Sequence, residues 1–139
     1  MKSSVLRTLV TLGLSAFSSV ALLAQDRMCA TIPFDFTIGA KSLAAGNYCV
    51  KKAQEHIVRI ENVDKGAGIF AMTLNTEPNK RSGKATLTFH RYGNTYFLAR
   101  MADGSSGREF FTSVAEKELI AKASSPEPAT ERTIVASKR

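Results

Sequence analysis

Residues 31–50 have the sequence TIPFDFTIGAKSLAAGNYCV, and this stretch decides the fold class. Within residues 31–38, apolar side chains alternate with polar ones or proline. This period of two is typical of a strand with one buried face and one solvent-facing face. The alternation stops at Gly39 and Ala40, which predict a turn, and residues 41–43 begin the return. We therefore expect a β-domain that opens with a hairpin.

Short strand-like runs follow along the rest of the chain. Gly93 and Asn94 separate two of them and form a strong hairpin signal. The run over 69–74 is compactly apolar and predicts a buried strand. The connections are too short for crossover helices, so five to seven strands favour a small antiparallel β-sandwich or partly open barrel. The further strands are expected over 47–53, 56–62, 84–92, 95–101 and 109–111.

The end of the chain changes period. Apolar residues recur at helical spacing over 113–123 and predict one C-terminal helix, packed on the sheet or laid across one end. Thr112 or Ser113 is placed to cap this helix, and Glu116 is placed to complete a capping box with Ser113. Residues 124–139 are predicted to be a flexible tail, although docking of 133–136 on a sheet edge stays open. The single β-rich domain is expected to span 25–123.

Residues 1–24 have the layout of a signal peptide. Basic residues precede an uncharged apolar run over 9–23, which is too short and too rich in Ser and Thr for a spanning helix. Cleavage after Ala24 is favoured, and cleavage after Ala21 stays open. The expected product is secreted or periplasmic and has no transmembrane anchor. Its net charge would be +7 − 2 = +5, because Lys2 and Arg7 are removed.

Three motifs carry a family resemblance. They are IPFDFTIG over 32–39, AGNYCV over 45–50, and FHRYGN over 89–94. Together they resemble an uncharacterised family of small secreted β-rich proteins of Acidobacteria and related soil bacteria. The resemblance implies export and a β fold. It brings no activity, cofactor or catalytic residue to this chain.

The chain has two cysteines, Cys29 and Cys49. In an exported protein two cysteines often pair. If the turn centres on Gly39 and Ala40, the two cysteines lie nearly opposite each other. If the loop instead runs over 39–46, their sulfurs lie roughly 20 Å apart and cannot bond. The sequence leaves both registers open.

No catalytic, cofactor-binding or metal-binding constellation stands out. The two histidines lack an acidic cluster, and His90 is expected to face solvent in its strand. Tyr92 and Tyr96 flank a turn, where they could stack on a sugar, although packing across the hairpin is favoured. The residues proposed for a ligand surface are Lys80, Arg81, Lys84, Arg91, Tyr92 and Tyr96.

The sequence predicts an exported non-catalytic β-domain with an envelope-associated binding or structural role. The alternative is a ligand-binding module for a glycan, a peptide or an anionic envelope polymer. The partner would be an envelope component or another exported protein, and nucleic acid is not expected. A ligand-binding module requires a contiguous basic or aromatic surface. The first reading tolerates scattered charge and allows an exposed edge strand, expected at the strand that holds Pro33.

Overall fold

The computed structural model describes residues 26–123 and 129–139, so the predicted signal peptide lies outside the described residues. Within these residues, eleven strands and one helix form a mainly β fold, which confirms the predicted class. The strands are β1 (Arg27–Ile32), β2 (Phe36–Ile38), β3 (Lys41–Leu43), β4 (Gly46–Gln54), β5 (Ile57–Asn62), β6 (Gly68–Thr76), β7 (Thr86–Tyr92), β8 (Thr95–Ala102), β9 (Gly107–Phe110), β10 (Thr130–Val135) and β11 (Ser137–Lys138), and the helix is α1 (Val114–Lys122).

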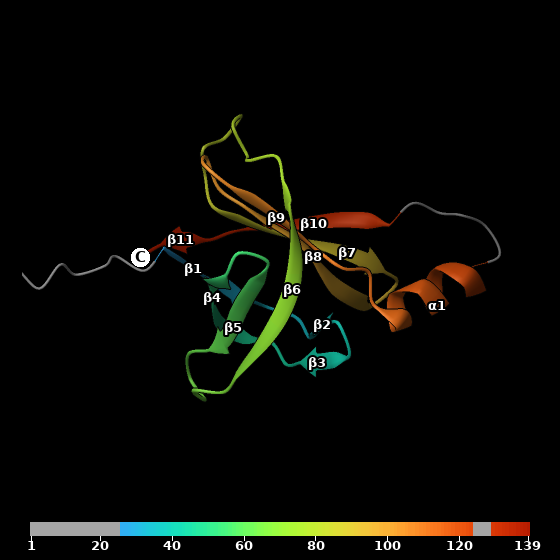
Figure 1. The fold of residues 1–139 in the computed structure, drawn as a ribbon. Coiled ribbons are helices and arrows are strands. Elements are labelled where there is room, and N and C mark those ends of the chain that lie inside the picture. Colours follow the sequence, from blue (N-terminus) through green and yellow to red (C-terminus); the bar gives the residue numbers. More distant parts are fainter. Residues whose placement is uncertain (1–25, 124–128) are drawn as a thin grey trace, which may run out of the picture.

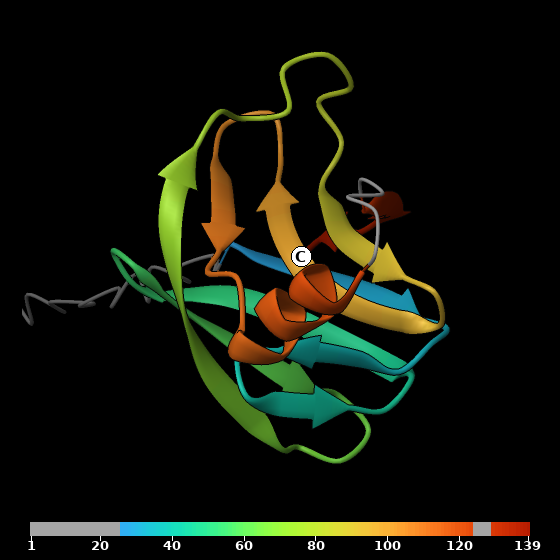
Figure 2. The same cartoon turned by 90° about the vertical axis from the view of Figure 1, so that its right-hand side faces the viewer.

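The strands form one sheet that folds over on itself (Figures 1 and 2). Its order is β10-β7-β8-β9-β6-β5-β4-β1-β11, and β2 joins β3 to β8 beside this path. The long strand β6 belongs to both halves: its first part pairs with β5 and its last part with β9. The sheet ends at β10 on one side and at β11 on the other, so it remains open, like a barrel that does not close.

Aromatic side chains fill the centre of the fold. Phe34 stacks on Tyr96 with ring centroids 3.9 Å apart and meets Phe89 edge-on at 5.1 Å. Phe36 packs edge-on against Tyr48 and Phe89. Offset and edge-on contacts of this kind stabilise a core beyond the burial of area alone. The aromatic cluster therefore joins the first strands of the chain to the β7–β8 hairpin.

The opening stretch differs in one respect from its prediction. The expected strand over 31–38 is split into β1 and β2, with a break at residues 33–35. Pro33 cannot donate to a ladder, and the chain leaves the sheet there. The alternation still predicts burial correctly, since Ile32, Phe36 and Ile38 are all buried. Pro33 lies in this break and does not form an exposed edge.

A disulfide joins Cys29 to Cys49, as one of the two registers predicts. The residues lie directly opposite each other on β1 and β4, with Cα atoms 4.0 Å apart. The pairs Phe36–Leu43 and Cys29–Cys49 sum to 79 and 78, so one hairpin register continues through the break with a shift of one residue. The register centred on the turn at Gly39 and Ala40 is therefore the correct one.

The C-terminal segment is part of the fold. β10 pairs along the whole of β7, and β11 pairs with β1 at Met28 and Cys29. The prediction of a flexible tail over 124–139 is wrong for residues 130–138, and the domain does not end at 123. The helix is consequently followed by two strands (Figure 1). The docking of 133–136, which the sequence left open, occurs on the edge of β7.

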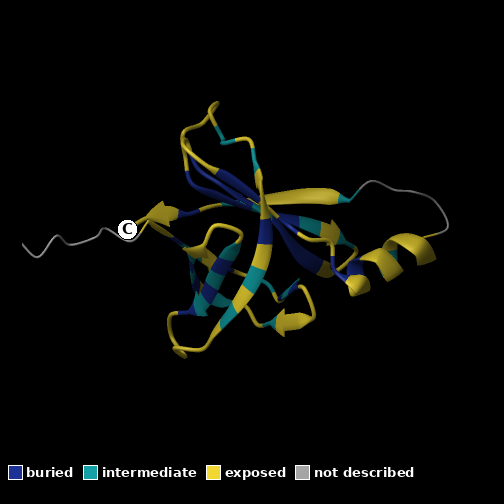
Figure 3. Ribbon diagram, viewed as in Figure 1, coloured by how far each residue is buried: buried dark blue, intermediate teal, exposed yellow. Residues whose placement is uncertain are grey.

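Strand β6 is the largest departure from the predicted burial. Its residues 69–74 were expected to be buried, yet Phe70, Met72 and Leu74 are 67%, 64% and 51% exposed. Thr73 is buried instead, and Ile69 and Ala71 are half-buried against the core. Figure 3 shows the resulting alternation of colours along β6. A compact apolar run does not reveal that only one of its two faces will be covered.

Candidate functional site

The six residues predicted to form a ligand surface do not come together. Lys80, Arg81 and Lys84 belong to the loop between β6 and β7, whereas Arg91 and Tyr92 lie at the opposite end of β7. The strand between the two groups is roughly 20 Å long. Tyr96 is buried against Phe34 and faces the core. Tyr92 and Tyr96 therefore lie on opposite faces of the hairpin and do not form a shared platform.

One of the two groups lines a hollow. The loop at 77–85 and the outer faces of β7, β8 and β10 enclose about 430 Å³. Lys80 and Arg81 line it, and Lys84 does not. Arg100 on β8 also lines it, and the sequence analysis did not select this residue. We call this space the Arg100 hollow; its other lining residues are Glu77, Pro78, Asn79, Thr86, Thr88, Ala102 and Thr133.

The helix is held by a buried carboxylate. Ser113 caps α1 as predicted, because its hydroxyl accepts a hydrogen bond of 3.1 Å from the Glu116 backbone N–H. The Glu116 carboxylate does not turn back to complete a capping box. It lies 2.7 Å from His90 Nδ1 and accepts a hydrogen bond of 3.0 Å from the Tyr92 hydroxyl. Burial, followed by the hydrogen bond and the charge of Glu116, raises the pKa of Tyr92 to about 12.

The helix does not pack on the sheet through its predicted apolar face. Val114 and Ile120 are 73% and 48% exposed, while Glu116 is buried. His90, expected to face solvent, instead supports the helix through this carboxylate. A sequence signal for this contact existed only in the spacing of His90 and Tyr92, which share one face of β7. Their partner Glu116, 26 residues after His90 and 24 after Tyr92, could not be identified from periodicity.

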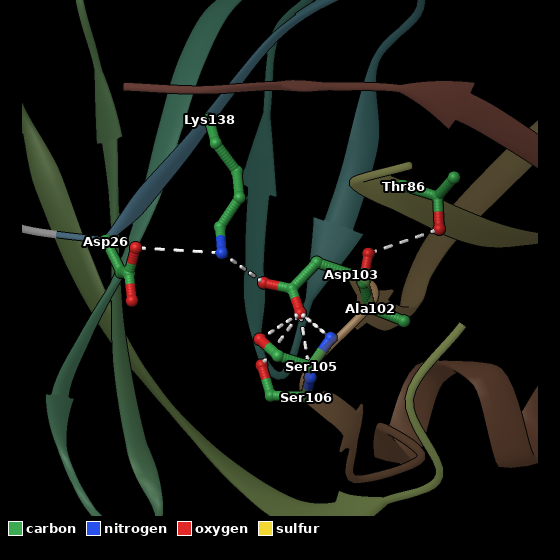
Figure 4. A network of polar contacts seen from close by, with 7 residues as sticks. All are labelled: Asp26, Thr86, Ala102, Asp103, Ser105, Ser106 and Lys138. Atoms are coloured by element: carbon green, nitrogen blue, oxygen red, sulfur yellow. Dashed lines mark hydrogen bonds and ion pairs between the residues drawn. The ribbon is translucent and has the colours of Figure 1, made fainter. Parts of the chain in front are cut away.

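A second polar cluster holds the C-terminal strand (Figure 4). One oxygen of the buried Asp103 carboxylate accepts hydrogen bonds from the backbone N–H groups of Ser105 and Ser106, and its other oxygen lies 3.0 Å from Lys138 Nζ. Burial alone raises the pKa of Asp103, but the hydrogen bonds from Ser105, Lys138 and Ser106 outweigh burial and hold that pKa well below its usual range. The hydrogen bond to Asp103 in turn raises the pKa of Lys138. This cluster therefore stabilises the position of strand β11 in the fold.

The outer face of β6 presents apolar side chains beside an unpaired backbone edge. Phe70, Met72 and Leu74 alternate along the strand and are all exposed. Strand β9 covers one edge of β6 only over 73–76, and β5 covers the other edge over 68–72. Within residues 26–123 and 129–139, no strand pairs with the remaining edge at 68–72. We call this combination of side chains and free edge the β6 edge.

The surrounding charges give the β6 edge a basic side. Lys51 on β4 lies directly opposite Arg59 on β5, and Arg59 lies directly opposite Phe70. The Arg59 guanidinium carbon is 6.0 Å from the centroid of the Phe70 ring. One acid shares this face, since Glu61 lies 3.5 Å from Arg59. Two cations directly opposite each other repel, so a further negative charge placed here would be favourable.

The comparisons add no family to this picture. Neither a protein-family model nor a curated protein nor a solved structure matches the chain. Among the described residues, no helix is long and apolar enough to span a membrane. The same part of the chain contains no group of three or more His, Cys, Asp or Glu residues placed to hold a metal ion. The function must therefore be argued from the surfaces themselves.

Proposed function

We propose that this protein is an exported, non-catalytic β-domain that binds an extended segment of another exported protein along the β6 edge. The observation that carries the proposal is the coincidence of Phe70 and Met72, both about two-thirds exposed, with an unpaired strand edge at 68–72. Apolar patches and free edges are each unusual on a protein that acts alone, because both promote association. The resemblance to a family of small secreted proteins supports export.

The backbone of β6 is oriented to accept a further strand. Thr73 donates its N–H to the His56 carbonyl with a distance of 2.8 Å, so odd-numbered residues of β6 bond to β5. Antiparallel pairing alternates, and the N–H and C=O groups of Phe70 and Met72 therefore point to the free edge. An added strand gains affinity from such main-chain groups and specificity from alternate side-chain contacts.

The chemistry of the partner follows from the side chains around this edge. The segment should carry apolar residues at every second position, to cover Phe70 and Met72. Arg59 lies on β5, across β6 from the free edge, with its guanidinium carbon 6.0 Å from the Phe70 ring centroid, so an acidic side chain of the segment would have to reach over Phe70 to meet it. Scattered charge elsewhere and the division of the predicted ligand surface disfavour a module built around those six residues.

Selection from a displayed peptide library tests the proposal. The full chain, expressed for export, is the bait, and the variant F70T/M72T is the counter-bait. The enriched peptides should alternate apolar residues and contain an acid, and their affinity for the variant should be lower by about tenfold or more. Methylation of alternate peptide nitrogens should abolish binding, because it removes the main-chain donors of an added strand.

A matched control removes two exposed apolar residues elsewhere. Val63 and Val135 are 56% and 63% exposed and lie off the β6 edge, so V63T/V135T should bind the peptides unchanged. The proposal fails if no peptide family is enriched, or if the enriched peptides bind F70T/M72T as tightly as the parent protein. Sedimentation that shows a concentration-dependent dimer, lost in F70T/M72T, would assign the edge to a second copy and also overturn a foreign partner.

A further inference from the structure

We propose that the Arg100 hollow is a binding site for a phosphate group. The site is independent of the β6 edge, because its walls are the loop at 77–85 and the outer faces of β7, β8 and β10. Cationic side chains without ion-pair partners among the described residues gather here, together with a half-buried guanidinium that is incompletely hydrogen-bonded.

Arg100 is the centre of this site. Its side chain passes beneath the loop, where Nη2 donates to the Glu77 carbonyl. Its Nε is buried and has no hydrogen-bond partner among residues 26–123 and 129–139. Glu109 lies directly opposite Arg100 on β9, and none of the ion pairs within the described residues joins the two. A buried donor left without an acceptor is destabilising, and a positive charge without a counter-ion adds to that cost.

Two more cations line the same space. Lys80 and Arg81 belong to the loop that forms its wall. None of the ion pairs formed within the described residues involves Lys80, Arg81 or Arg100. The acid in the lining is Glu77; Arg100 bonds to its backbone carbonyl, and its carboxylate remains as one negative charge beside the hollow. Three positive charges against one negative charge produce a local positive potential that attracts an anion.

The neutral lining residues suit phosphate. Thr88 on β7 and Thr133 on β10 both line the hollow, and their hydroxyl oxygens are 3.4 Å apart. Hydroxyls donate readily to phosphate oxygens, and arginine presents a planar fork of donors to the same group. A doubly charged phosphate balances more of the three cations than a single carboxylate does. The volume of about 430 Å³ leaves room for the group to which the phosphate is esterified.

Titration of the protein, expressed from the full chain, with inorganic phosphate provides the test. The Arg100 Nε–Hε resonance in a ¹⁵N-correlated NMR spectrum is the specific readout, and it should shift in a saturable manner. Acetate at equal ionic strength should produce a shift that does not saturate. Glycerol phosphate and phosphatidylglycerol vesicles then distinguish a phosphate on a soluble or polymeric ester from a lipid headgroup.

Two variants and one control locate the site. R100Q should weaken phosphate binding by about tenfold. Because Arg100 also supports the loop, K80Q/R81Q on the exposed loop serves as a second variant and should weaken binding by about tenfold as well. K41Q/K84Q removes the same number of charges outside the lining, and its affinity should stay within about twofold of the parent protein.

Three results would overturn the proposal. The first is an absence of saturable shifts with phosphate. The second is equal weakening by K41Q/K84Q and K80Q/R81Q, which would show a general effect of net charge. The third is binding of acetate as tight as that of phosphate. Loss of β6-edge peptide binding in F70T/M72T would leave phosphate binding unchanged, so the two proposals can fail separately.

Discussion

The half-sheet formed by β1, β4, β5 and β6 has two edges, and among the described residues a further strand pairs with β1 at one edge but not with residues 68–72 of β6 at the other. At β1, the chain's own strand β11 pairs with Met28 and Cys29, and a disulfide joins β1 to β4 at Cys29. Lys138 of β11 is fastened by the buried Asp103. At β6, residues 68–72 have no such cover among the described residues, and two of the largest exposed apolar side chains lie there.

The difference shows where the molecule avoids association and where it permits it. An uncovered edge is a hazard that natural proteins close with charges, prolines or covering segments. This chain closes one edge with several separate interactions and leaves the other with apolar residues and no proline. The β1 edge therefore contributes to stability, and the β6 edge is available for binding. Five predictions concern the two edges, and they are given from the largest expected effect to the smallest.

Removal of the disulfide should have the largest effect. The double variant C29S/C49S opens a loop of 20 residues, and the free energy of unfolding should fall by about 3 kcal/mol. Chemical denaturation measures this difference. Reductant should destabilise the parent protein to the same extent and leave C29S/C49S unchanged. A loss below about 1 kcal/mol would show that the β1 edge is held mainly by pairing and packing.

Replacement of Asp103 should come next. D103N removes the charge that accepts from Ser105 and Lys138, and should lower the free energy of unfolding by about 2 kcal/mol at neutral pH. D26N is the matched control, because Asp26 contacts the same lysine but is exposed, and it should change stability by less than about 0.5 kcal/mol.

The same carboxyl makes stability depend on pH. The folded pKa of Asp103 lies below its unfolded value of about 3.9, so its contribution is present above that pH and is lost as the pH falls through lower values. Unfolding curves recorded from pH 6 down to pH 2 should show this loss in the parent protein. The loss should be smaller in D103N. Equal slopes in both proteins would contradict the prediction.

A smaller effect is expected for Lys138, which is partly exposed. K138Q should cost less than about 1 kcal/mol, since Asp103 retains its bonds to Ser105 and Ser106. In a double-mutant cycle with D103N, the coupling energy should be about 0.5–1 kcal/mol. A coupling near zero would mean that the ion pair does not help to hold β11 on β1.

Substitutions on the β6 edge should have the smallest effect on the free energy of unfolding. F70T/M72T should change the free energy of unfolding by no more than about 0.5 kcal/mol, because both side chains are already about two-thirds exposed. The measurement is the same denaturation assay, with V63T/V135T as the control. A loss above about 1.5 kcal/mol would show that these residues belong to the core and would remove the contrast between the two edges.

Some features of this protein follow from its sequence. The alternation over 31–38 identifies the core residues of the first strands, and Gly93 with its neighbour Asn94 identifies the β7–β8 hairpin. Ser113 identifies the start of the helix. Each of these signals acts over a few residues, through side-chain periodicity, a turn conformation or a single capping bond. Local physical chemistry is sufficient for them.

Other features depend on contacts between distant segments. The sequence permitted two registers for Cys29 and Cys49, and only the pairing of β1 with β4 selects one. The folding of β6 between two half-sheets decides that Phe70 is exposed. Tyr96 becomes a core residue because Phe34, which is 62 positions earlier, stacks on it. The burial of a residue and the identity of its partner depend on the neighbouring strands. They cannot be predicted from the periodicity of a single strand.

The candidate sites also divide into features that the sequence predicts and features that only the tertiary structure shows. The sequence predicted the class of the fold and an exposed loop that carries the basic pair Lys80 and Arg81. It could not add Arg100, whose position beneath the loop depends on the pairing of β7 with β8. Nor could it identify the free edge of β6, because an edge exists only once every other strand has found its neighbour. Composition and spacing determine which residues can bind, and long-range pairing determines where they meet.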